Sequence, residues 1–364
     1  MTRIFLIRHA EAEGNIYRRA HGHHEGRVTG RGYQQIRLLR ERFLNESIDA
    51  VYSSDLHRAM ETAKALAEPR GLRIVKSKML REVDLGEWED KAWGDLEYAD
   101  PQMSGYFSFD PERWSVGGGE AFSDVIRRAT DFIRDTAERH DGQTIAFFSH
   151  GFTIRAFFSK LMGYASHEVS KAGYCDNTAV ALLIFENGQL TIEYQRDNSH
   201  LSAESSTFAH QTWWRTERKL ISENLRYMPL DNKRDYEMLK LYTAETGRFP
   251  FEDKAYAAFR RDEPIGLIGL DTSRRERREE RGGIGESDYG WISCIFIRPE
   301  SRRMNYGVQL LGLAISEYRR MRREYLRIKA LRDSAAVGFC LKYGFEVVYE
   351  TDEYLLMQKY IRNW

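Results

Sequence analysis

The sequence contains little cysteine and no long apolar run. Its 364 residues include three cysteines, Cys175, Cys294 and Cys340, which lie far apart in the chain. This spacing excludes a disulfide framework and a CxxC metal site, and it favours a reducing compartment. No apolar stretch approaches the roughly 20 residues of a membrane-spanning helix, and the first residues lack the basic and apolar parts of a signal peptide. We therefore expect a cytoplasmic protein without a membrane partner.

The sequence also lacks an excess of charge of either sign. Its 55 lysine and arginine residues are balanced by 55 aspartate and glutamate residues. A general electrostatic attraction to nucleic acid is therefore not indicated, and we expect no nucleic-acid partner. The run RRERREERGG (274–283) has mixed signs and is interpreted as a solvated hairpin tip. No feature of the sequence indicates an oligomeric state.

The chain is longer than one usual domain, and its pattern changes near residue 202. Before that point, short apolar runs alternate with amphipathic helical patterns, which predicts an α/β sheet with helices on both faces. The small polar stretch SAESST (202–207) is typical of a linker. We predict one domain over 1–204 and another over 205–364. The strands predicted for the first domain are 3–7, 49–54, 73–77, 144–151, 178–186 and 190–195, and its helices are 32–44, 56–71, 123–140 and 152–162.

The second domain mixes helices and strands in a different order. A helical segment is predicted to begin within HQTWWRTERKLISENL (210–225). The strands predicted after it are 256–261, 265–273, 291–300, 325–331 and 354–361, and the helices are 307–323 and 335–344.

Five polar residues of the first domain follow predicted strands. Arg8 and His9 end the first strand, and His150 ends another. Arg58 lies in the first turn of the helix after YSSD, and Glu82 follows a further strand-like run. In open α/β sheets the carboxyl ends of the strands meet at one edge. We therefore expect these side chains to lie together.

This set of residue types suits a phosphoryl group. Arginines hold phosphate oxygens through forked, charge-assisted hydrogen bonds. A neutral imidazole is a nucleophile toward phosphorus, and a carboxylic acid can protonate the departing alkoxide and later activate water. Phosphoryl transfer depends above all on positioning and charge neutralisation, which arginines and a second histidine can supply in place of metals.

Six motifs resemble, in order, those of the histidine phosphatase superfamily, also called the phosphoglycerate mutase-like family. RHAEAEGN (8–15) is similar to its RHGETxxN signature, with Ala10 and Ala12 in place of Gly and Thr. The resemblance covers residues 1 to about 201. The other five motifs are VTGRGYQQ (28–35), YSSDLHRAMETA (52–63), LREVDLGEWE (80–89), GGGEAF (117–122) and SHG (149–151).

The resemblance implies a three-layer α/β/α domain of the phosphoglycerate mutase-like fold. It implies that His9 is the nucleophile that becomes phosphohistidine and that Glu82 is the proton donor. The substrate would be a small phosphorylated metabolite, and no metal would be required; HGHH (21–24) is accordingly not predicted to hold one. The residues implied to bind the phosphoryl group are Arg8, Asn15, Arg58 and His150.

Two reactions are compatible with this resemblance. Mutases of the family keep the phosphohistidine under a long covering insertion, whereas this chain has only a modest segment, 88–114, between Glu82 and the GGGE stretch. A shorter cover admits water, and water ends the cycle as hydrolysis. We favour a phosphomonoesterase, with a phosphoglycerate mutase as the alternative.

A second constellation lies in WISCIFIRPESRRMNYGVQLL (291–311), where a strand precedes a loop and a helix start. Helix N-termini bind pyrophosphate because their first N–H groups are unpaired and their dipole is positive. The stretch resembles the RxxGxG/A loop of the GNAT superfamily of N-acetyltransferases, with Asn305 in place of the first glycine. AAVGFCLKYGFEVV (335–348) resembles the family's AxxFYxKxGF block, with Cys340 in place of its tyrosine.

This second resemblance implies an α+β GNAT-like domain that uses acetyl-CoA to acetylate an amine acceptor. A backbone N–H on a β-bulged strand around Phe296 would polarise the thioester, and Cys340 is a candidate for the acid that protonates the thiolate. Glu286 and Asp288 are candidates for the base. The alternative is a non-catalytic acyl-CoA-binding module. The residues implied to bind the cofactor are Phe296, Ile297, Arg302, Arg303, Asn305, Tyr306, Gly307 and Val308.

Overall fold

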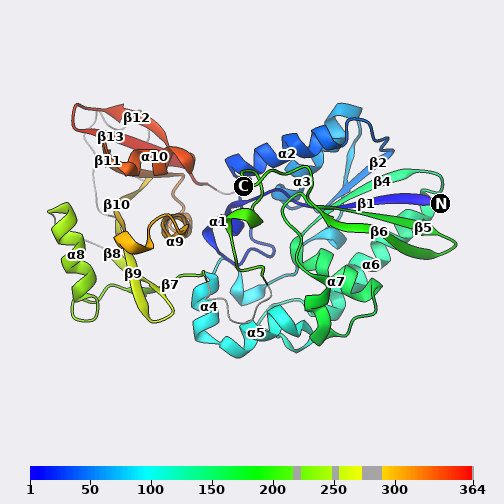
Figure 1. Ribbon diagram of the computed structural model, residues 1–364, viewed down its shortest axis with the longest axis horizontal. Coiled ribbons are helices and arrows are strands. Elements are labelled where there is room, and N and C mark those ends of the chain that lie inside the picture. Colours follow the sequence, from blue (N-terminus) through cyan, green and yellow to red (C-terminus); the bar gives the residue numbers. More distant parts are fainter. Residues whose placement is uncertain (216–222, 248–253, 273–288, 363–364) are drawn as a thin grey trace. The chain divides into compact units, whose positions relative to one another are not determined.

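A computed structural model describes residues 1–215, 223–247, 254–272 and 289–362. These fall into two compact units (Figure 1). The first comprises Met1–Asn15, Ala20–Lys91 and Ala99–Ile221, and the second comprises Ile16–Arg19, Ala92–Tyr98 and Ser222–Trp364. Two short segments of the N-terminal half thus belong to the second unit, and the division at 204/205 stays a prediction.

Some predicted features lie outside the described residues. They are the hairpin tip at 274–283 and the candidate bases Glu286 and Asp288. Among the helices that the structure describes, none has the length and apolar character required to cross a bilayer.

The first unit is built on a six-stranded sheet with the order β3-β2-β4-β1-β5-β6. β1 pairs in parallel with β4, and β2 pairs in parallel with both β4 and β3. The carboxyl ends of these four strands therefore lie at one edge of the sheet. β5 and β6 form the predicted antiparallel hairpin. The strands are β1 (Thr2–Arg8), β2 (Ala50–Ser53), β3 (Ile74–Lys76), β4 (Thr144–Ser149), β5 (Val180–Glu186) and β6 (Gln189–Asp197).

Helices cover both faces of this sheet, which confirms the predicted three-layer α/β/α arrangement (Figure 1). Alternate side chains of β1 point to opposite faces. Phe5 and Ile7 join a core with α2 and α3, whereas Ile4 and Leu6 join a core with α6 and α7. The helices of the N-terminal half are α1 (Glu13–Tyr17), α2 (Gly30–Arg42), α3 (His57–Ala67), α4 (Trp93–Ala99), α5 (Pro101–Phe109), α6 (Phe122–Arg139) and α7 (Gly151–Leu161).

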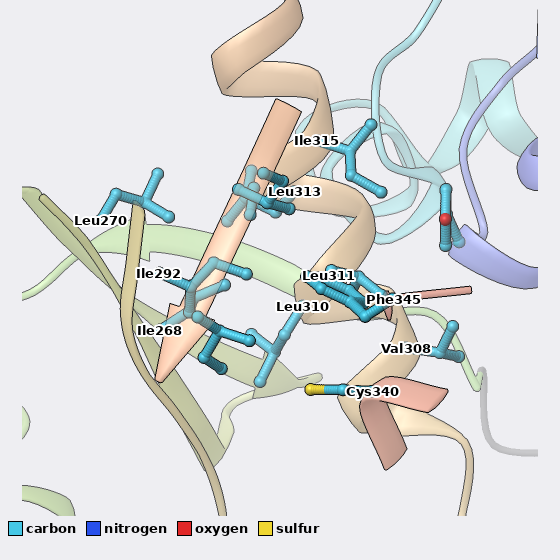
Figure 2. Close-up of a cluster of buried hydrophobic side chains, with 14 of the residues drawn as sticks. Ile268, Leu270, Ile292, Val308, Leu310, Leu311, Leu313, Ile315, Cys340 and Phe345 are labelled. Atoms are coloured by element: carbon cyan, nitrogen blue, oxygen red, sulfur yellow. The ribbon is translucent and has the colours of Figure 1, made fainter. Parts of the chain in front are cut away.

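The second unit contains a seven-stranded sheet with the order β12-β13-β11-β10-β9-β8-β7. Among its described strands, the β10–β11 pair is parallel and the other pairs are antiparallel. α9 and α10 pack on one core (Figure 2), and α8 contributes to another. This is the α+β arrangement expected for the second domain. The elements are β7 (Arg226–Pro229), α8 (Tyr236–Thr246), β8 (Lys254–Arg260), β9 (Glu263–Asp271), β10 (Tyr289–Ile297), α9 (Tyr306–Arg320), β11 (Tyr325–Leu331), α10 (Ala335–Lys342), β12 (Glu346–Glu350) and β13 (Tyr354–Tyr360).

The middle of the segment 210–225, within which a helix is predicted to begin, lies outside the described residues, at 216–222. Residues 211–215 and 223–225 on either side are not helical; the Trp214 indole N–H donates to the carbonyls of Phe208 and Gln211, and its ring stacks on Phe208. One prediction for the second half was wrong within the described residues. The register irregularity of β10 lies between Ile292 and Cys294 rather than around Phe296.

Candidate active site

The first unit brings the two predicted histidines together at the carboxyl edge of its sheet. Arg8 and Ser149, the last residues of β1 and β4, are paired in register. The residues that follow them, His9 and His150, therefore lie side by side. The His9 N–H donates to the Ser149 carbonyl at 2.9 Å. The two imidazole centroids are 5.1 Å apart. The parallel β1–β4 pairing thus places both rings at one site.

Hydrogen bonding fixes the tautomer of His9. Its Nδ1 lies 2.7 Å from the Ala10 carbonyl oxygen, which can only accept, so Nδ1 carries the proton. Nε2 therefore bears the lone pair. Burial, with help from the nearby Arg58 and Arg8 guanidinium groups, holds the pKa of His9 well below its usual value. The ring is consequently neutral at physiological pH, with the lone pair of Nε2 unprotonated.

His150 is completely buried, yet its polar atoms are unused. Neither ring nitrogen has a hydrogen-bond partner among the described residues, and the same holds for Nε of Arg8. Burial and the neighbouring Arg58 hold the pKa of His150 well below its usual value. Because buried polar groups are normally hydrogen-bonded, these three atoms indicate a place for a polar ligand.

Two buried guanidinium groups flank the histidines. Arg8 donates from Nη1 to the Cys175 carbonyl at 2.6 Å. Arg58, at the start of α3, donates to the carbonyls of Gly22 at 2.7 Å, His24 at 3.0 Å and His21 at 3.3 Å. Within the described chain, these guanidinium groups thus bond to carbonyl oxygens and to no carboxylate. Because buried charges are normally paired, this arrangement is suited to an anion.

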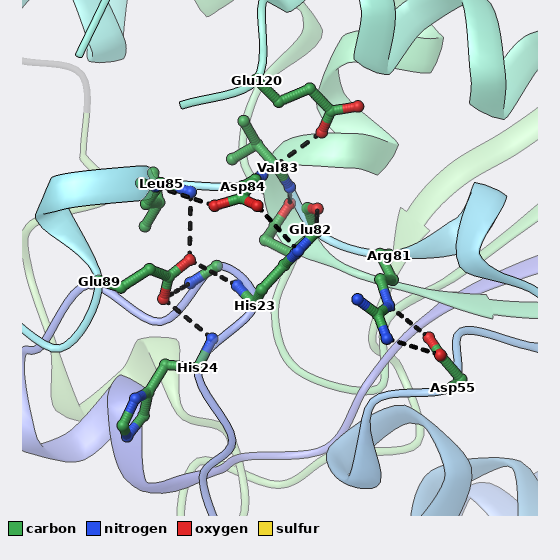
Figure 3. A network of polar contacts seen from close by, with 12 residues as sticks. His23, His24, Asp55, Arg81, Glu82, Val83, Asp84, Leu85, Glu89 and Glu120 are labelled. Carbon is green, nitrogen blue, oxygen red and sulfur yellow. Dashed lines mark hydrogen bonds and ion pairs between the residues drawn. The ribbon is translucent and has the colours of Figure 1, made fainter. Parts of the chain in front are cut away.

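Glu82, whose side chain is labelled in Figure 3, binds the N-terminus of α7. Its carboxylate accepts from the backbone N–H groups of Phe152 and Thr153 at 3.1 and 3.0 Å, and from the Thr153 hydroxyl at 3.2 Å. The N–H of Val83 also donates to it at 3.1 Å. We call Arg8, His9, Arg58 and His150 the phosphate-suited cluster. Since α7 begins directly after His150, these bonds fix the Glu82 carboxylate next to this cluster.

Asn15 and two unpredicted residues order the backbone around His9. The Asn15 side-chain oxygen accepts from the Ala12 N–H at 2.9 Å, so only its amide N–H groups are left to face a phosphate. The Asn177 amide donates to the His9 carbonyl at 3.0 Å. The Ala10 N–H donates to the Thr62 hydroxyl at 2.8 Å. Thr62 lies within a quoted motif, whereas no pattern in the sequence marks Asn177.

In the predicted cofactor region of the second unit, the neighbouring strands β10 and β11 are paired along only part of their length. β10 and β11 pair only as far as Ile292 and Ile328, although β10 continues to Ile297. The loop after β10 carries Arg303 and Asn305 with φ of 62° and 60°, and α9 begins at the next residue. The first turn of α9 thus comes directly after a tight loop with left-handed backbone. The N–H groups of this turn are those predicted from the sequence to bind the pyrophosphate of the cofactor.

The side chains predicted to bind the cofactor have varied surroundings. Arg302 is ion-paired with Glu245 at 2.6 Å. An added Cβ on Gly307 would lie 3.1 Å from the Phe339 ring, so this glycine serves the packing of α9 on α10. The other residues divide by exposure: Phe296, Tyr306 and Val308 are buried, Ile297 is half-buried, and Arg303 is exposed.

Cys340 lies in the apolar core between α9, α10 and the sheet (Figure 2). It is 1% exposed, and burial raises the pKa of its thiol to about 12. A thiol in this environment is a weaker acid than the free coenzyme thiol, whose chemistry resembles that of an ordinary cysteine. Its surroundings therefore favour a packing role.

Comparison with known proteins gives two family matches. A family model described as histidine phosphatase superfamily (branch 1) matches residues 4–198, and one described as acetyltransferase (GNAT) family matches residues 213–345. Both agree with the motifs on which the sequence-based resemblances rest.

Three relatives illustrate the first match. The chain is 29% identical over 201 residues to phosphoserine phosphatase 1 of Hydrogenobacter thermophilus, covering 55% of this chain and 95% of that protein. It is 31% identical over 204 residues to phosphoglycerate mutase-like protein 4 of Arabidopsis thaliana, covering 54% and 86%. The solved structure of Bacillus stearothermophilus YhfR is 28% identical, with a TM-score of 0.53 over 55% of this chain and 99% of that chain.

Proposed function

The chain belongs to the histidine phosphatase superfamily and carries a GNAT-family domain, and on this premise we propose that it hydrolyses phosphomonoesters through a phosphohistidine on His9. The observation that supports this best is the pair of buried guanidinium groups, Arg8 and Arg58, whose bonds in the described chain go to no carboxylate. They flank a neutral His9 and the unbonded ring of His150. A dianionic phosphoryl group would satisfy all of these groups together.

The first step transfers the phosphoryl group to the enzyme. The lone pair on His9 Nε2 attacks phosphorus while the bond to the ester oxygen breaks. Arg8, Arg58 and His150 neutralise the charge on the phosphoryl oxygens, and the Asn15 amide assists. Glu82, in its protonated form, gives its proton to the departing alkoxide, which leaves as the alcohol.

The second step regenerates the enzyme. Glu82, now a carboxylate, removes a proton from water, and the resulting hydroxide equivalent attacks the phosphohistidine. The N–P bond breaks, inorganic phosphate departs and His9 returns to its neutral state. No metal takes part in either step.

Phosphoserine and 3-phosphoglycerate are the first substrates to assay, since relatives are named for phosphoserine phosphatase and phosphoglycerate mutase. We expect inorganic phosphate from at least one phosphorylated metabolite. Isomerisation of 3-phosphoglycerate in the presence of a bisphosphoglycerate primer, without phosphate release, would instead identify a mutase.

Glu82→Gln should slow phosphoryl transfer in a way that depends on the leaving group. An alkoxide, as from phosphoserine, needs a proton, so we expect its single-turnover rate to fall by about 10²-fold or more. Nitrophenolate is a stable anion that leaves without a proton. The rate of the nitrophenol burst from nitrophenyl phosphate should therefore fall by less than about tenfold.

The same comparison separates chemistry from structure. Glu82 also binds the N-terminus of α7 through Phe152 and Thr153. If that positioning were its whole contribution, both substrates would lose rate equally, and this result would remove Glu82 from the proton-donor role.

For the second domain we propose acetyl-CoA binding at the N-terminus of α9 and transfer of the acetyl group to an amine. The left-handed loop at Arg303 and Asn305 and the strand pair that opens beyond Ile292 support the binding site. The core position of Cys340 argues that another group protonates the thiolate. A domain that binds acyl-CoA without turnover is the second candidate, favoured by the same burial of Cys340.

Acetyl-CoA affinity should depend on the backbone of residue 305. Asn305 has φ of 60°, which glycine adopts freely and a β-branched residue resists. We expect Asn305→Gly to bind as tightly as the parent and Asn305→Val to bind about tenfold more weakly, measured by calorimetry. Equal affinity in all three proteins would place the coenzyme elsewhere. Free thiol released with candidate amines would identify the transferase, and binding without release the non-catalytic module.

A further inference from the structure

Three potential metal ligands meet outside the phosphate-suited cluster. His21 and His24 come from the HGHH segment, and Asp90 follows the LGEWE motif. One ligand atom from each lies within 4.8 Å of the others. Asp90 Oδ1 is 3.4 Å from Nε2 of His21 and 3.9 Å from Nε2 of His24, and the two rings are 4.7 Å apart.

The two distances to Asp90 are close to those around a four-coordinate zinc-like ion. With metal–ligand bonds of about 2.0–2.2 Å, two ligand atoms at a tetrahedral angle lie about 3.3–3.6 Å apart. The His21–Asp90 separation of 3.4 Å matches this value. The His24–Asp90 separation of 3.9 Å reaches it when the His24 ring moves by about half an ångström.

The protonation state of His21 also suits a ligand. Burial lowers its pKa to about 4, so the ring is neutral at pH 7. A neutral ring at 3.4 Å from Asp90 makes only a long hydrogen bond. Its Nδ1 has no partner in the described part of the chain, so the proton can reside there and leave Nε2 to bind a metal.

The loop that carries both histidines is held from two sides, and Figure 3 shows the side formed by Glu89. Its N–H groups at Gly22, His23 and His24 donate to the Glu89 carboxylate at 3.1, 2.6 and 2.9 Å. Its carbonyl groups accept from Arg58. Opposite, the Asp90 N–H donates to the Ala20 carbonyl at 2.8 Å. The ligands are therefore pre-positioned, and binding needs little rearrangement of the backbone.

We propose that His21, His24 and Asp90 bind a borderline divalent cation of the zinc class, with water completing the coordination. Two imidazoles and one carboxylate are ligands that such ions accept. This departs from the sequence-based prediction that HGHH holds no metal, because Asp90 is 69 positions from His21 and only the fold brings the two together. The ion takes no part in phosphoryl transfer; it would bind to the loop that Arg58 also contacts.

Cobalt titration of the full chain tests this site. Metal-stripped protein without a histidine tag is titrated with Co²⁺, whose visible absorption bands report four-coordinate binding. We expect one ion per chain, displaced by Zn²⁺. Asp90→Asn and His24→Gln should each weaken binding by about tenfold or more. His23→Gln is the matched control, because it removes an imidazole from the same loop but not from the ligand set.

Several results would overturn the site. They are the absence of stoichiometric binding, undiminished affinity in Asp90→Asn and His24→Gln, or loss of binding in His23→Gln. Thermal unfolding of each variant without metal shows whether it is folded. Zn²⁺ should raise the unfolding temperature of the parent and of His23→Gln, and should leave that of Asp90→Asn nearly unchanged.

Discussion

Replacement of His9 by alanine is expected to reduce phosphomonoesterase turnover by about 10⁴-fold or more, because the substitution removes the atom that forms the covalent bond to phosphorus in the proposed mechanism. The arginines would still bind the phosphoryl group, so substrate affinity should change far less than turnover. The methyl side chain is smaller than the imidazole that Nδ1 anchors to the Ala10 carbonyl, and a modest loss of stability is expected as well.

A covalent intermediate provides a direct test. Parent enzyme mixed with labelled substrate and quenched in alkali, in which phosphohistidine survives, should carry label, and His9→Ala should carry none. His140→Ala serves as the control, because His140 bonds to Tyr52 and Gln143 away from the cluster. Label retained in His9→Ala, or turnover within tenfold of the parent, would remove His9 from the reaction.

The sequence predicts the core of this site because local rules determine it. A fully apolar run identifies β1 as a buried strand, and the alternation of strands and helices predicts a sheet covered by helices on both faces. Residues at strand ends, such as His9 and His150, then meet at one edge whatever the details of the loops. The motif resemblance adds Arg58 and Glu82, whose positions depend on loops that periodicity does not describe.

Other parts depend on contacts between distant segments. The Asp90 carboxylate lies 69 positions from His21 in the chain, so no ligand spacing relates them. Asn177, 168 positions from His9, supports its carbonyl in the same way. β7 is short and ends at Pro229, and a proline in a short run argues against a strand. In the second unit, the inclusion of Ile16–Arg19 and Ala92–Tyr98 follows from packing that the sequence does not reveal.

Replacement of Arg58 by lysine is expected to lower kcat/KM by about 10²–10³-fold, although the positive charge is kept. Lysine has no planar fork, so it cannot hold the loop carbonyls and a phosphoryl oxygen in fixed directions together. Inorganic phosphate, as a product inhibitor, should bind correspondingly more weakly. The measurement is a comparison of kcat/KM and of the phosphate inhibition constant between parent and variant.

Arg70 offers a matched control for the structural part of that effect. Its guanidinium also donates to three backbone carbonyls, those of Leu66, Phe43 and Glu46, but it lies at the end of α3, remote from the first turn that holds Arg58. Arg70→Lys should lower the unfolding temperature, as Arg58→Lys should, while leaving kcat/KM within about twofold. If the two variants lost activity equally, the carbonyl bonds would account for the effect of Arg58. If only Arg58→Lys lost activity, we would conclude that the Arg58 guanidinium binds the phosphoryl group.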